Sequence, residues 1–183
     1  MRVSVVGGSG AGKTTFARKL AHAIGGTHIE LDAINWQAGW RDLNTEDPEE
    51  FRRRTAQAVA AERWAACGNY SKVADLVRAR ATDLVWLDYP RWRIMGRVLR
   101  RSLARAIGGQ ELWEGTGNTE TFARWLSKEH PIRWSWDTYA GRKVRYQAMM
   151  DGEEWAGLRV HRVTRPKEAD ALIRRFAAEA RAS

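Results

Sequence analysis

The chain has 183 residues, of which 44% are hydrophobic and 29% are charged, as in a single globular domain. Its single cysteine, Cys67, cannot form an internal disulfide, and no apolar run has the length of a membrane span. We therefore expect a cytoplasmic protein with no membrane partner. The formal net charge of +9 fits a protein that handles phosphorylated ligands or nucleic acid.

The N-terminal part of the chain carries the clearest motif. The β-branched run at residues 2–6 ends in glycines and predicts a buried central strand. Residues 7–14 match the phosphate-loop pattern G-x-x-x-x-G-K-[ST], and helical spacing of apolar residues follows over 13–24. Glycines let successive backbone N–H groups turn toward one anion, and the start of a helix adds partial positive charge. The order of strand, loop and helix predicts a site for ATP, with GTP as the alternative.

The residues of the loop have separate expected roles in holding a nucleoside triphosphate and Mg²⁺. Lys13 can reach the β- and γ-phosphates and assist transfer, and the Thr14 hydroxyl can hold Mg²⁺. Thr15 is expected to meet the α-phosphate. The remaining contacts to the nucleotide are expected from Gly8, Ser9, Gly10, Ala11 and Gly12.

Strand and helix patterns alternate through the rest of the chain. Strands are predicted at 27–32, 63–67, 84–88 and 157–164. Helices are predicted at about 47–62, 72–81, 90–107, 141–150 and 166–181. Residues 108–140 are irregular and rich in tryptophan, like an insertion. The alternation predicts an α/β fold with a parallel sheet that is covered by helices on both faces.

Two classes of phosphate-loop protein are disfavoured because the sequence lacks features that they require. No guanine-reading N/T-K-x-D segment is present, which argues against a GTPase. A ring ATPase would need more chain for its second domain. A small kinase-like core remains.

Several later motifs, together with the phosphate loop, resemble those of adenylate-kinase-related proteins often labelled topology modulation proteins. These motifs are His28-x-x-x-Asp32, Trp36, Gly39-Trp40, Gly68-Asn69-Tyr70, Asp88-Tyr89-Pro90-Arg91-Trp92 and Arg97-Val-Leu-Arg-Arg. The resemblance covers residues 1–105 and, loosely, the last strand and helix. It implies the P-loop NTPase fold in one domain, with a five-stranded parallel sheet centred on the phosphate-loop strand. It also implies an acceptor-binding region at about 33–62 and a helical lid at about 106–145.

Asp32 is the leading candidate for the acceptor side of the site, because it closes the predicted second strand where a parallel sheet forms its ligand crevice. A carboxylate there can accept or orient the proton of an acceptor hydroxyl, and a turn cap is the alternative role. Glu30 points to the same face of the strand, so one of the two can touch Mg²⁺ through water. The other candidates for substrate binding are Trp36, Trp40, Asn69, Tyr70 and Arg91.

Two residues bear on magnesium. Asp88 follows four apolar residues, as in a Walker B strand, and is a candidate Mg²⁺ group beside Thr14, with a turn cap as the alternative. The resembling proteins usually carry an Asp of the magnesium shell where this chain has Cys67. A thiol is a poor ligand for Mg²⁺, so either Asp32 and Asp88 carry the metal or catalysis is weakened.

Arginines dominate the segment after the fourth predicted strand, where no acid lies between Tyr89 and Gln110. By resemblance to nucleotide kinases, Arg97 and Arg101, on one helical face, are expected to stabilise the transferring phosphate, and a solvated basic face is the alternative. In related kinases the turn after the last strand flanks the adenine, so the resemblance implies that Arg162 and Arg165 neighbour it, with an ordinary strand-to-helix turn as the alternative.

The sequence thus predicts an ATP-dependent, adenylate kinase-like phosphotransferase. It would transfer the γ-phosphate of Mg-ATP to a nucleoside monophosphate or to a small-molecule hydroxyl. The net charge leaves open a P-loop NTPase that binds or modifies nucleic acid. Cys67 leaves open a nucleotide-binding regulator with weak catalysis.

Overall fold

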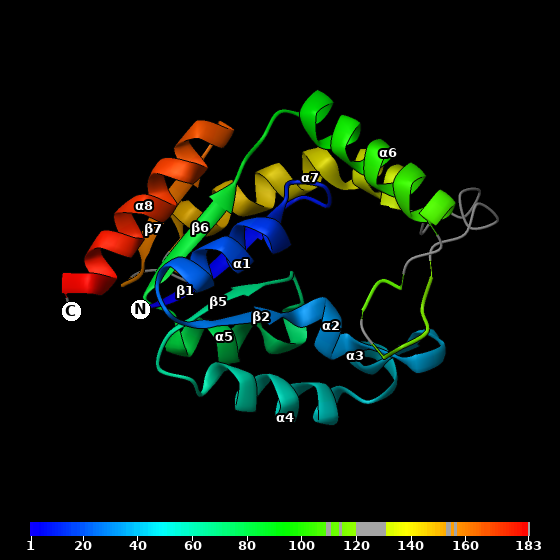
Figure 1. Ribbon diagram of the computed structural model, residues 1–183, viewed down its shortest axis with the longest axis horizontal. Coiled ribbons are helices and arrows are strands. Elements are labelled where there is room, and N and C mark those ends of the chain that lie inside the picture. Colours follow the sequence, from blue (N-terminus) through cyan, green and yellow to red (C-terminus); the bar gives the residue numbers. More distant parts are fainter. Residues whose placement is uncertain (109–110, 114, 120–130, 153–154, 156, 183) are drawn as a thin grey trace.

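The computed structural model describes residues 1–108, 111–113, 115–119, 131–152, 155 and 157–182 (Figure 1). Its centre is a parallel five-stranded sheet in the order β2-β5-β1-β6-β7. The strands are β1 (Arg2–Gly7), β2 (Thr27–Glu30), β5 (Trp64–Cys67), β6 (Asp83–Leu87) and β7 (Arg159–Val163). The strand before the phosphate loop is central, as predicted. All the parallel strands therefore direct their carboxyl ends to the edge where that loop lies.

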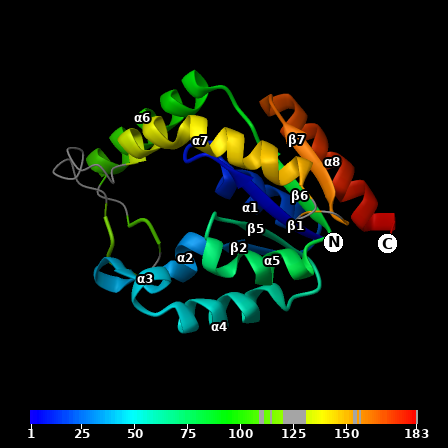
Figure 2. The same ribbon diagram turned by 180° about the vertical axis from the view of Figure 1, so that it is seen from behind.

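Helices cover both faces of the sheet, which confirms the predicted fold class. On one face lie α1 (Lys13–Ala23) and α8 (Pro166–Ala182), which face the viewer in Figure 1. The other face, toward the viewer in Figure 2, carries α4 (Pro48–Val59), α5 (Ala74–Arg80) and α7 (Pro131–Asp151). The long helix α6 (Arg91–Gly108) packs against α7.

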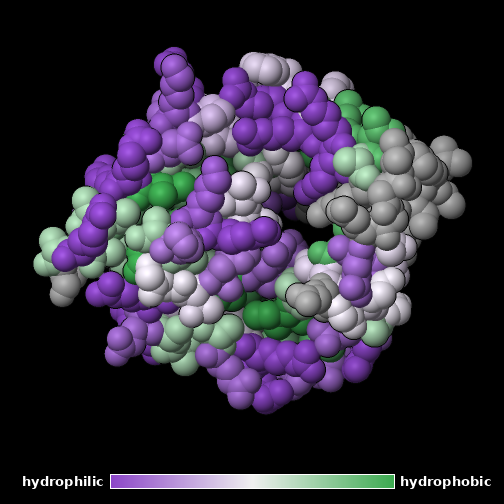
Figure 3. Space-filling model, in the orientation of Figure 1, coloured by the Kyte–Doolittle hydropathy of each residue, from purple (hydrophilic) through white to green (hydrophobic). Residues whose placement is uncertain are grey.

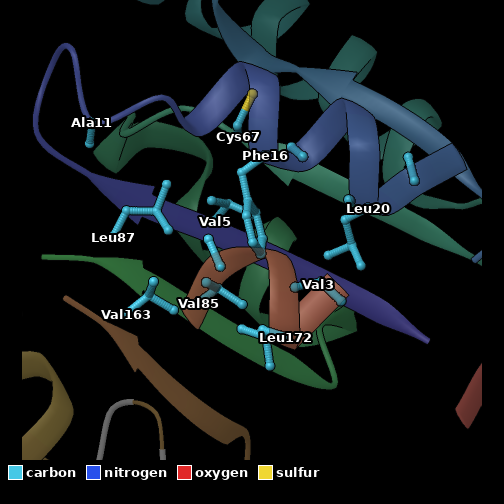
Figure 4. Close-up of a cluster of buried hydrophobic side chains, with 14 of the residues drawn as sticks. Val3, Val5, Ala11, Phe16, Leu20, Cys67, Val85, Leu87, Val163 and Leu172 are labelled. Carbon is cyan, nitrogen blue, oxygen red and sulfur yellow. The ribbon is translucent and has the colours of Figure 1, made fainter. Parts of the chain in front are cut away.

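The face under α1 and α8 is a continuous apolar core. Alternate residues of β1, Val3 and Val5, point to this side and meet Phe16 and Leu20 of α1 (Figure 4). Such alternation follows from the two-residue period of a strand. Val3, Val5 and Leu20 have no measurable exposure, so this core fixes α1, and with it the start of the phosphate-binding helix.

The opposite face is covered by two separate apolar clusters instead of one. The first joins β2 and β5 to α4 and α5, and the second joins β1 and β6 to Tyr146 of α7 and to Trp155. Between them, two small side chains meet on this face, because Ser4 of β1 lies directly beside Ala66 of β5 in the sheet. The boundary between the two clusters, here called the seam, is therefore filled by small side chains at the level of the sheet.

Short elements connect β2 to α4 at the carboxyl edge of the sheet. They are α2 (Leu31–Asn35), β3 (Trp36–Gln37), the 3-10 turn η1 (Ala38–Trp40), β4 (Arg41–Asp42) and α3 (Leu43–Glu46). The strands β3 and β4 form a two-stranded antiparallel hairpin. Its turn has consecutive positive φ angles at Gly39 (69°) and Trp40 (64°), a conformation typical of tight hairpins. A second 3-10 turn, η2 (Ser71–Val73), precedes α5.

Two of the predicted boundaries are wrong. The second strand ends at Glu30 instead of Asp32, because its partner β5 ends at Cys67 and offers no further backbone to pair with. The helix predicted at 141–150 begins at Pro131, within the stretch expected to be irregular. Since α7 contacts α6 as well as the sheet, its apolar residues do not form the single stripe on which sequence patterns rely. No helix in the described ranges has both the length and the apolar character needed to cross a lipid bilayer.

The backbone after β5 yields a test of the fold. Gly68 has φ +134°, and a Cβ there would lie 2.6 Å from Leu31 Cβ. We expect Gly68→Ala to lower the free energy of unfolding by about 1–3 kcal/mol. The matched control is Gly141→Ala in α7, where a Cβ meets nothing and the helix gains up to about 1 kcal/mol. Urea unfolding of both variants measures this, and equal stabilities would contradict the close approach of α2 to Gly68.

Candidate functional site

The phosphate loop joins β1 to α1 at the carboxyl edge of the sheet. Gly10 (φ +81°) and Gly12 (φ +90°) adopt left-handed conformations, which favour glycine, and α1 begins directly afterwards at Lys13. The backbone closes through hydrogen bonds from Ala11 N–H to the Gly8 carbonyl (3.2 Å) and from Phe16 N–H to the Gly12 carbonyl (2.9 Å). The first N–H groups of α1 thus lie at the loop, where a helix favours an anion.

Lys13 crosses the loop and donates a hydrogen bond from Nζ to the Gly8 carbonyl (3.0 Å). Burial lowers the pKa of Lys13 to about 8; the charge of Asp32 opposes the shift, and those of Arg142 and Arg101 add to it. A polyphosphate at this position would favour the ammonium form again. A bound anion would therefore stabilise the charged form of Lys13.

Two predicted site residues support the backbone of the loop. Asn69 donates from Nδ2 to the Gly7 carbonyl (2.8 Å), and Arg97 donates from Nη1 to the Ala11 carbonyl (3.0 Å). Asn69, predicted to bind substrate, thus fixes the start of the loop, and Arg97 brings its charge to the loop. The guanidinium of Arg97 also lies over the ring of Tyr89 (5.1 Å).

The helix α6 lies directly on the loop. Its Ile94 and Val98 are buried, and a Cβ at Gly10 would overlap Val98 Cγ2. Glycine at position 10 is thus required both by its φ angle and by the approach of α6. Since Arg97 and Arg101 belong to the same helix, this packing holds both cations close to Lys13.

The carboxylate nearest to Thr14 is Glu30. Thr14 Oγ1 donates to Glu30 Oε1 (3.1 Å), and the Cys67 thiol lies 3.9 Å from Thr14 Oγ1. Burial, followed by the charge of Glu30, raises the pKa of Cys67 to about 12, so the thiol stays protonated and is unsuited to Mg²⁺. The oxygens of Thr14 and Glu30 are hard ligands and fit the ion.

Asp88, the other predicted magnesium residue, contacts basic side chains instead of Thr14. Its Oδ2 accepts from Arg162 Nε (2.9 Å) and Nη2 (2.5 Å), and Lys143 Nζ lies 4.0 Å away. Arg162, predicted to lie near adenine, is thus paired with Asp88, and its guanidinium also lies over the Trp86 ring, 4.6 Å from the ring centre. Arg165 uses its backbone N–H to bond Glu168 at the start of α8 (3.1 Å).

Asp32 lies in the first turn of α2, two residues beyond the end of β2. Its Oδ1 accepts a hydrogen bond from the Tyr70 hydroxyl (2.6 Å), so the structure brings together two residues predicted for the acceptor side. Burial and the Asp32 charge raise the pKa of Tyr70, which keeps its hydroxyl a donor. The charge of Asp32 also reaches Lys13, which places this pair beside the phosphate loop.

The predicted acceptor tryptophans pack against the segment that follows α6. The rings of Trp36 and Trp40 are 5.8 Å apart, and both lie close to Trp113, at 6.3 and 6.1 Å. Asn118 fixes the contact: it accepts from the Trp40 N–H and donates to the Gln37 carbonyl, each at 2.9 Å. The hairpin of the predicted acceptor region thus touches the predicted lid, whose residues 120–130 lie outside the described ranges.

Arg91, predicted to bind an acceptor anion, packs on α7. It donates to the Trp136 carbonyl (2.7 Å), and its guanidinium lies 3.7 Å from the centre of the Trp136 ring. The sequence did not single out Arg142 of α7, which is half-buried and whose charge acts on both Lys13 and Asp32. The spacing of Arg142, Tyr146 and Met149 on one helical face was the available clue.

The space-filling view shows a hollow beside the loop, edged mainly by hydrophilic residues (Figure 3). Next to the loop, a narrow cavity of about 20 Å³ is bounded by Gly8, Asp88, Tyr139 and Arg142. Cationic groups from α1, α6 and α7 therefore converge on one edge of the sheet, with the carboxylates of Glu30 and Asp32 facing them.

Solved kinase structures share this architecture. A shikimate kinase from Acinetobacter baumannii in complex with shikimate is similar with a TM-score of 0.54 and 20% identity, covering 96% of this chain and 89% of that one. A gluconokinase from Sinorhizobium meliloti 1021 is similar with a TM-score of 0.51 and 15% identity, covering 98% and 90%. The chain has the P-loop kinase fold. No protein-family model and no curated protein sequence matches it.

In this P-loop kinase fold, the lowered pKa of Lys13 predicts how nucleotide binding depends on pH. Free protein with a Lys13 pKa of about 8 is mostly deprotonated at that residue at pH 9, whereas the phosphate-bound form retains the proton. We expect Mg-ATP to bind roughly tenfold more weakly at pH 9 than at pH 7. Isothermal titration calorimetry at both pH values measures this. Lys13→Arg serves as control, because arginine keeps its charge; the same decline in that variant would contradict the assignment.

Proposed function

We propose that the protein transfers the γ-phosphate of Mg-ATP to a hydroxyl of a small acceptor. The observation that carries the proposal is the convergence of cations with the Asp32–Tyr70 pair at the phosphate loop. Anion-binding backbone and positive charge suit the donor, and a carboxylate suits the acceptor hydroxyl. The similarity to solved kinases supports the fold on which this arrangement rests.

The donor would lie along residues 8–15, with backbone N–H groups and Lys13 around its phosphates. Thr14 and Glu30 would hold Mg²⁺, which supplies charge neutralisation to the phosphate oxygens when bound. Arg97, Arg101 and Arg142 would face the negative charge of the transferring group. In this arrangement Glu30 takes the metal role that the sequence suggested for Asp88.

The acceptor would present its hydroxyl to Asp32. A carboxylate accepts several hydrogen bonds, so Asp32 can hold both the Tyr70 hydroxyl and the acceptor hydroxyl. The acceptor oxygen forms a bond to the γ-phosphorus while the bond from that phosphorus to the bridging oxygen of ADP breaks. The proton of the hydroxyl passes to Asp32, and ADP leaves with the bridging oxygen.

The region 33–62 and the segment 106–145 keep their proposed roles as acceptor-binding region and lid. The contact of Trp36 and Trp40 with Trp113 supports this, because it joins the two segments across the open side of the site. A nucleic-acid function is less well supported. Arg91 and Arg97, which the sequence placed on a basic helix, are used for contacts within the protein.

Replacement of Lys13 tests the proposed donor site. We expect Lys13→Ala to abolish the stabilisation of the protein by Mg-ATP and to lower kcat by about 10²–10³, because a cation facing the developing charge is lost. The control is Lys19→Ala, an exposed lysine of the same helix, which should behave as wild type. Thermal shift and coupled ADP-release assays measure both effects. Equal stabilisation of wild type and Lys13→Ala by Mg-ATP would refute the site.

A second pair of variants separates the two candidate metal carboxylates. Glu30→Gln should raise the Mg²⁺ concentration needed for half-maximal ADP release by about tenfold or more, since a charged oxygen ligand beside Thr14 is lost. Asp88→Asn should leave that concentration close to the wild-type value, because its contacts are to Arg162 and Lys143. A larger shift for Asp88→Asn than for Glu30→Gln would reverse the assignment.

A further inference from the structure

A cavity of about 100 Å³ lies on the face of the sheet that carries α5 and α7. It occupies the seam between the two apolar clusters of that face. Its floor is formed by small or short side chains of neighbouring strands, Ser4, Val6 and Ala66. Ala74 and Val77 of α5 form one wall, and α7 forms the other. The cavity exists because the central strands carry small residues where the two helices fail to meet.

One end of the cavity, here called its mouth, adjoins the proposed acceptor site. The cavity is lined there by Asn69, Tyr70 and Arg142. Asn69 donates to the Gly7 carbonyl, and Tyr70 donates to Asp32. The charge of Arg142 lowers the pKa of Lys13. Arg145, three residues and about one turn further along α7, also lines this space. The mouth is therefore polar and cationic, and it adjoins the carboxylate that would receive the acceptor hydroxyl.

The far end of the cavity is apolar except for one donor. Met149 lies seven residues beyond Arg142 on α7, which corresponds to about 10 Å of helix, and Trp155 follows before β7. Trp155 is only 5% exposed. Among the described residues, no atom accepts a hydrogen bond from its Nε1–H. Buried donors are normally paired, so an indole N–H without a protein acceptor at the wall of a cavity suits a ligand atom.

The size of the cavity limits what enters it. A cavity of 150 Å³ lined by apolar side chains admits benzene, so by proportion 100 Å³ admits about four non-hydrogen atoms. A branched or small cyclic apolar group has this size, whereas a purine base exceeds it. An anionic substituent on the same molecule would remain at the mouth, near Arg142 and Arg145.

We propose that this cavity binds the apolar end of the phosphoryl acceptor, and that the acceptor is a small amphipathic alcohol instead of a nucleoside monophosphate. The proposal rests on the kinase function proposed above. The hydroxyl lies at Asp32, the compact apolar group lies over Ser4 and Ala66, and a hydrogen-bond acceptor on that group meets Trp155 Nε1–H.

Binding in the cavity is measured without catalysis by ¹⁵N–¹H NMR of the indole groups. The chain has ten tryptophans, and Trp155→Phe identifies the resonance of Trp155. Isobutanol, which combines a branched apolar group with a hydroxyl, should shift this resonance saturably, and AMP should not. Absence of a saturable shift with isobutanol, or a shift with AMP that isobutanol competes away, overturns the proposal.

A matched pair of variants on α5 locates the binding. Ala74 lines the cavity and is half-buried, whereas Ala79 is exposed on the same helix. Ala74→Leu fills the space and should weaken isobutanol binding at least tenfold, while Ala79→Leu should change it less than twofold. Equal binding by Ala74→Leu and wild type would show that isobutanol binds elsewhere and would contradict the proposal.

Trp155→Phe distinguishes a ligand donor from a packing residue. Trp155→Phe removes part of a buried ring, so lost packing should lower the urea midpoint whatever the role of the N–H. Loss of a hydrogen bond to the ligand should in addition weaken binding of a probe such as acetone, whose carbonyl accepts the bond, by about three- to tenfold. Acetone binding that is unaffected by Trp155→Phe, measured by the shifts of the other indole resonances, argues against this donor role.

Turnover separates this proposal from the kinase function itself. With Mg-ATP, short branched or cyclic alcohols bearing a carboxylate should release ADP faster than AMP does, and Ala74→Leu should raise their KM at least tenfold with little change in kcat. If Mg-ATP binding depends on Lys13 but AMP is the better acceptor, the cavity proposal fails and the kinase function stands. If Mg-ATP binding is independent of Lys13, the kinase function fails, and the NMR titration still reports whether the cavity is a binding site.

Discussion

The constraint on which the site depends is the concentration of positively charged side chains around the phosphate loop, residues 7–14. Lys13, Arg97, Arg101 and Arg142 come from three different helices, and burial together with neighbouring cations makes the ammonium form of Lys13 less favourable than in water, which lowers its pKa. Such a cluster opposes folding unless other groups offset it. Carbonyl oxygens of the loop do so, since Gly8 accepts from Lys13 and Ala11 accepts from Arg97. The backbone carbonyls of the loop therefore accept hydrogen bonds from Lys13 and Arg97. The oxygens of a polyphosphate would be stronger acceptors for these two cations.

The same constraint explains the position of the carboxylates. Glu30 is the last residue of the second strand and Asp32 lies in the first turn of the next helix, so a single short segment supplies negative charge near Thr14 and Lys13. Glu30 accepts from Thr14, and Asp32 accepts from Tyr70, which suits the proposed division of the site into a metal side and an acceptor side. The neutral thiol of Cys67 lies between strand and loop without adding charge. In this arrangement, a cysteine at the end of β5 is compatible with a magnesium site because the carboxylate comes from β2.

The central part of the fold was predictable from local patterns. Residues 2–14 combine strand, glycine loop and Lys-Thr in a short stretch, so the phosphate site required no tertiary information. The pairing of Asp88 with Arg162 was not predictable, because it joins residues that are far apart in the chain and that parallel β6 and β7 bring together. The role of Asn69 was missed for a similar reason, since its amide binds the backbone carbonyl of Gly7 on a neighbouring strand. The start of α7 at Pro131 was missed because helix packing on two sides removes a regular apolar stripe.

The two faces of the sheet contribute differently to specificity. Under α1 and α8 the packing forms one continuous cluster, so this face fixes the loop. On the opposite face, α5 and α7 belong to separate clusters, and the small side chains of Ser4 and Ala66 separate them. Filling that seam with larger residues would have strengthened the core by hydrophobic burial. An indole N–H without a protein acceptor among the described residues reduces stability. A loss of stability at the seam is the expected consequence if, as we propose, the seam keeps space for a substrate beside the phosphate loop.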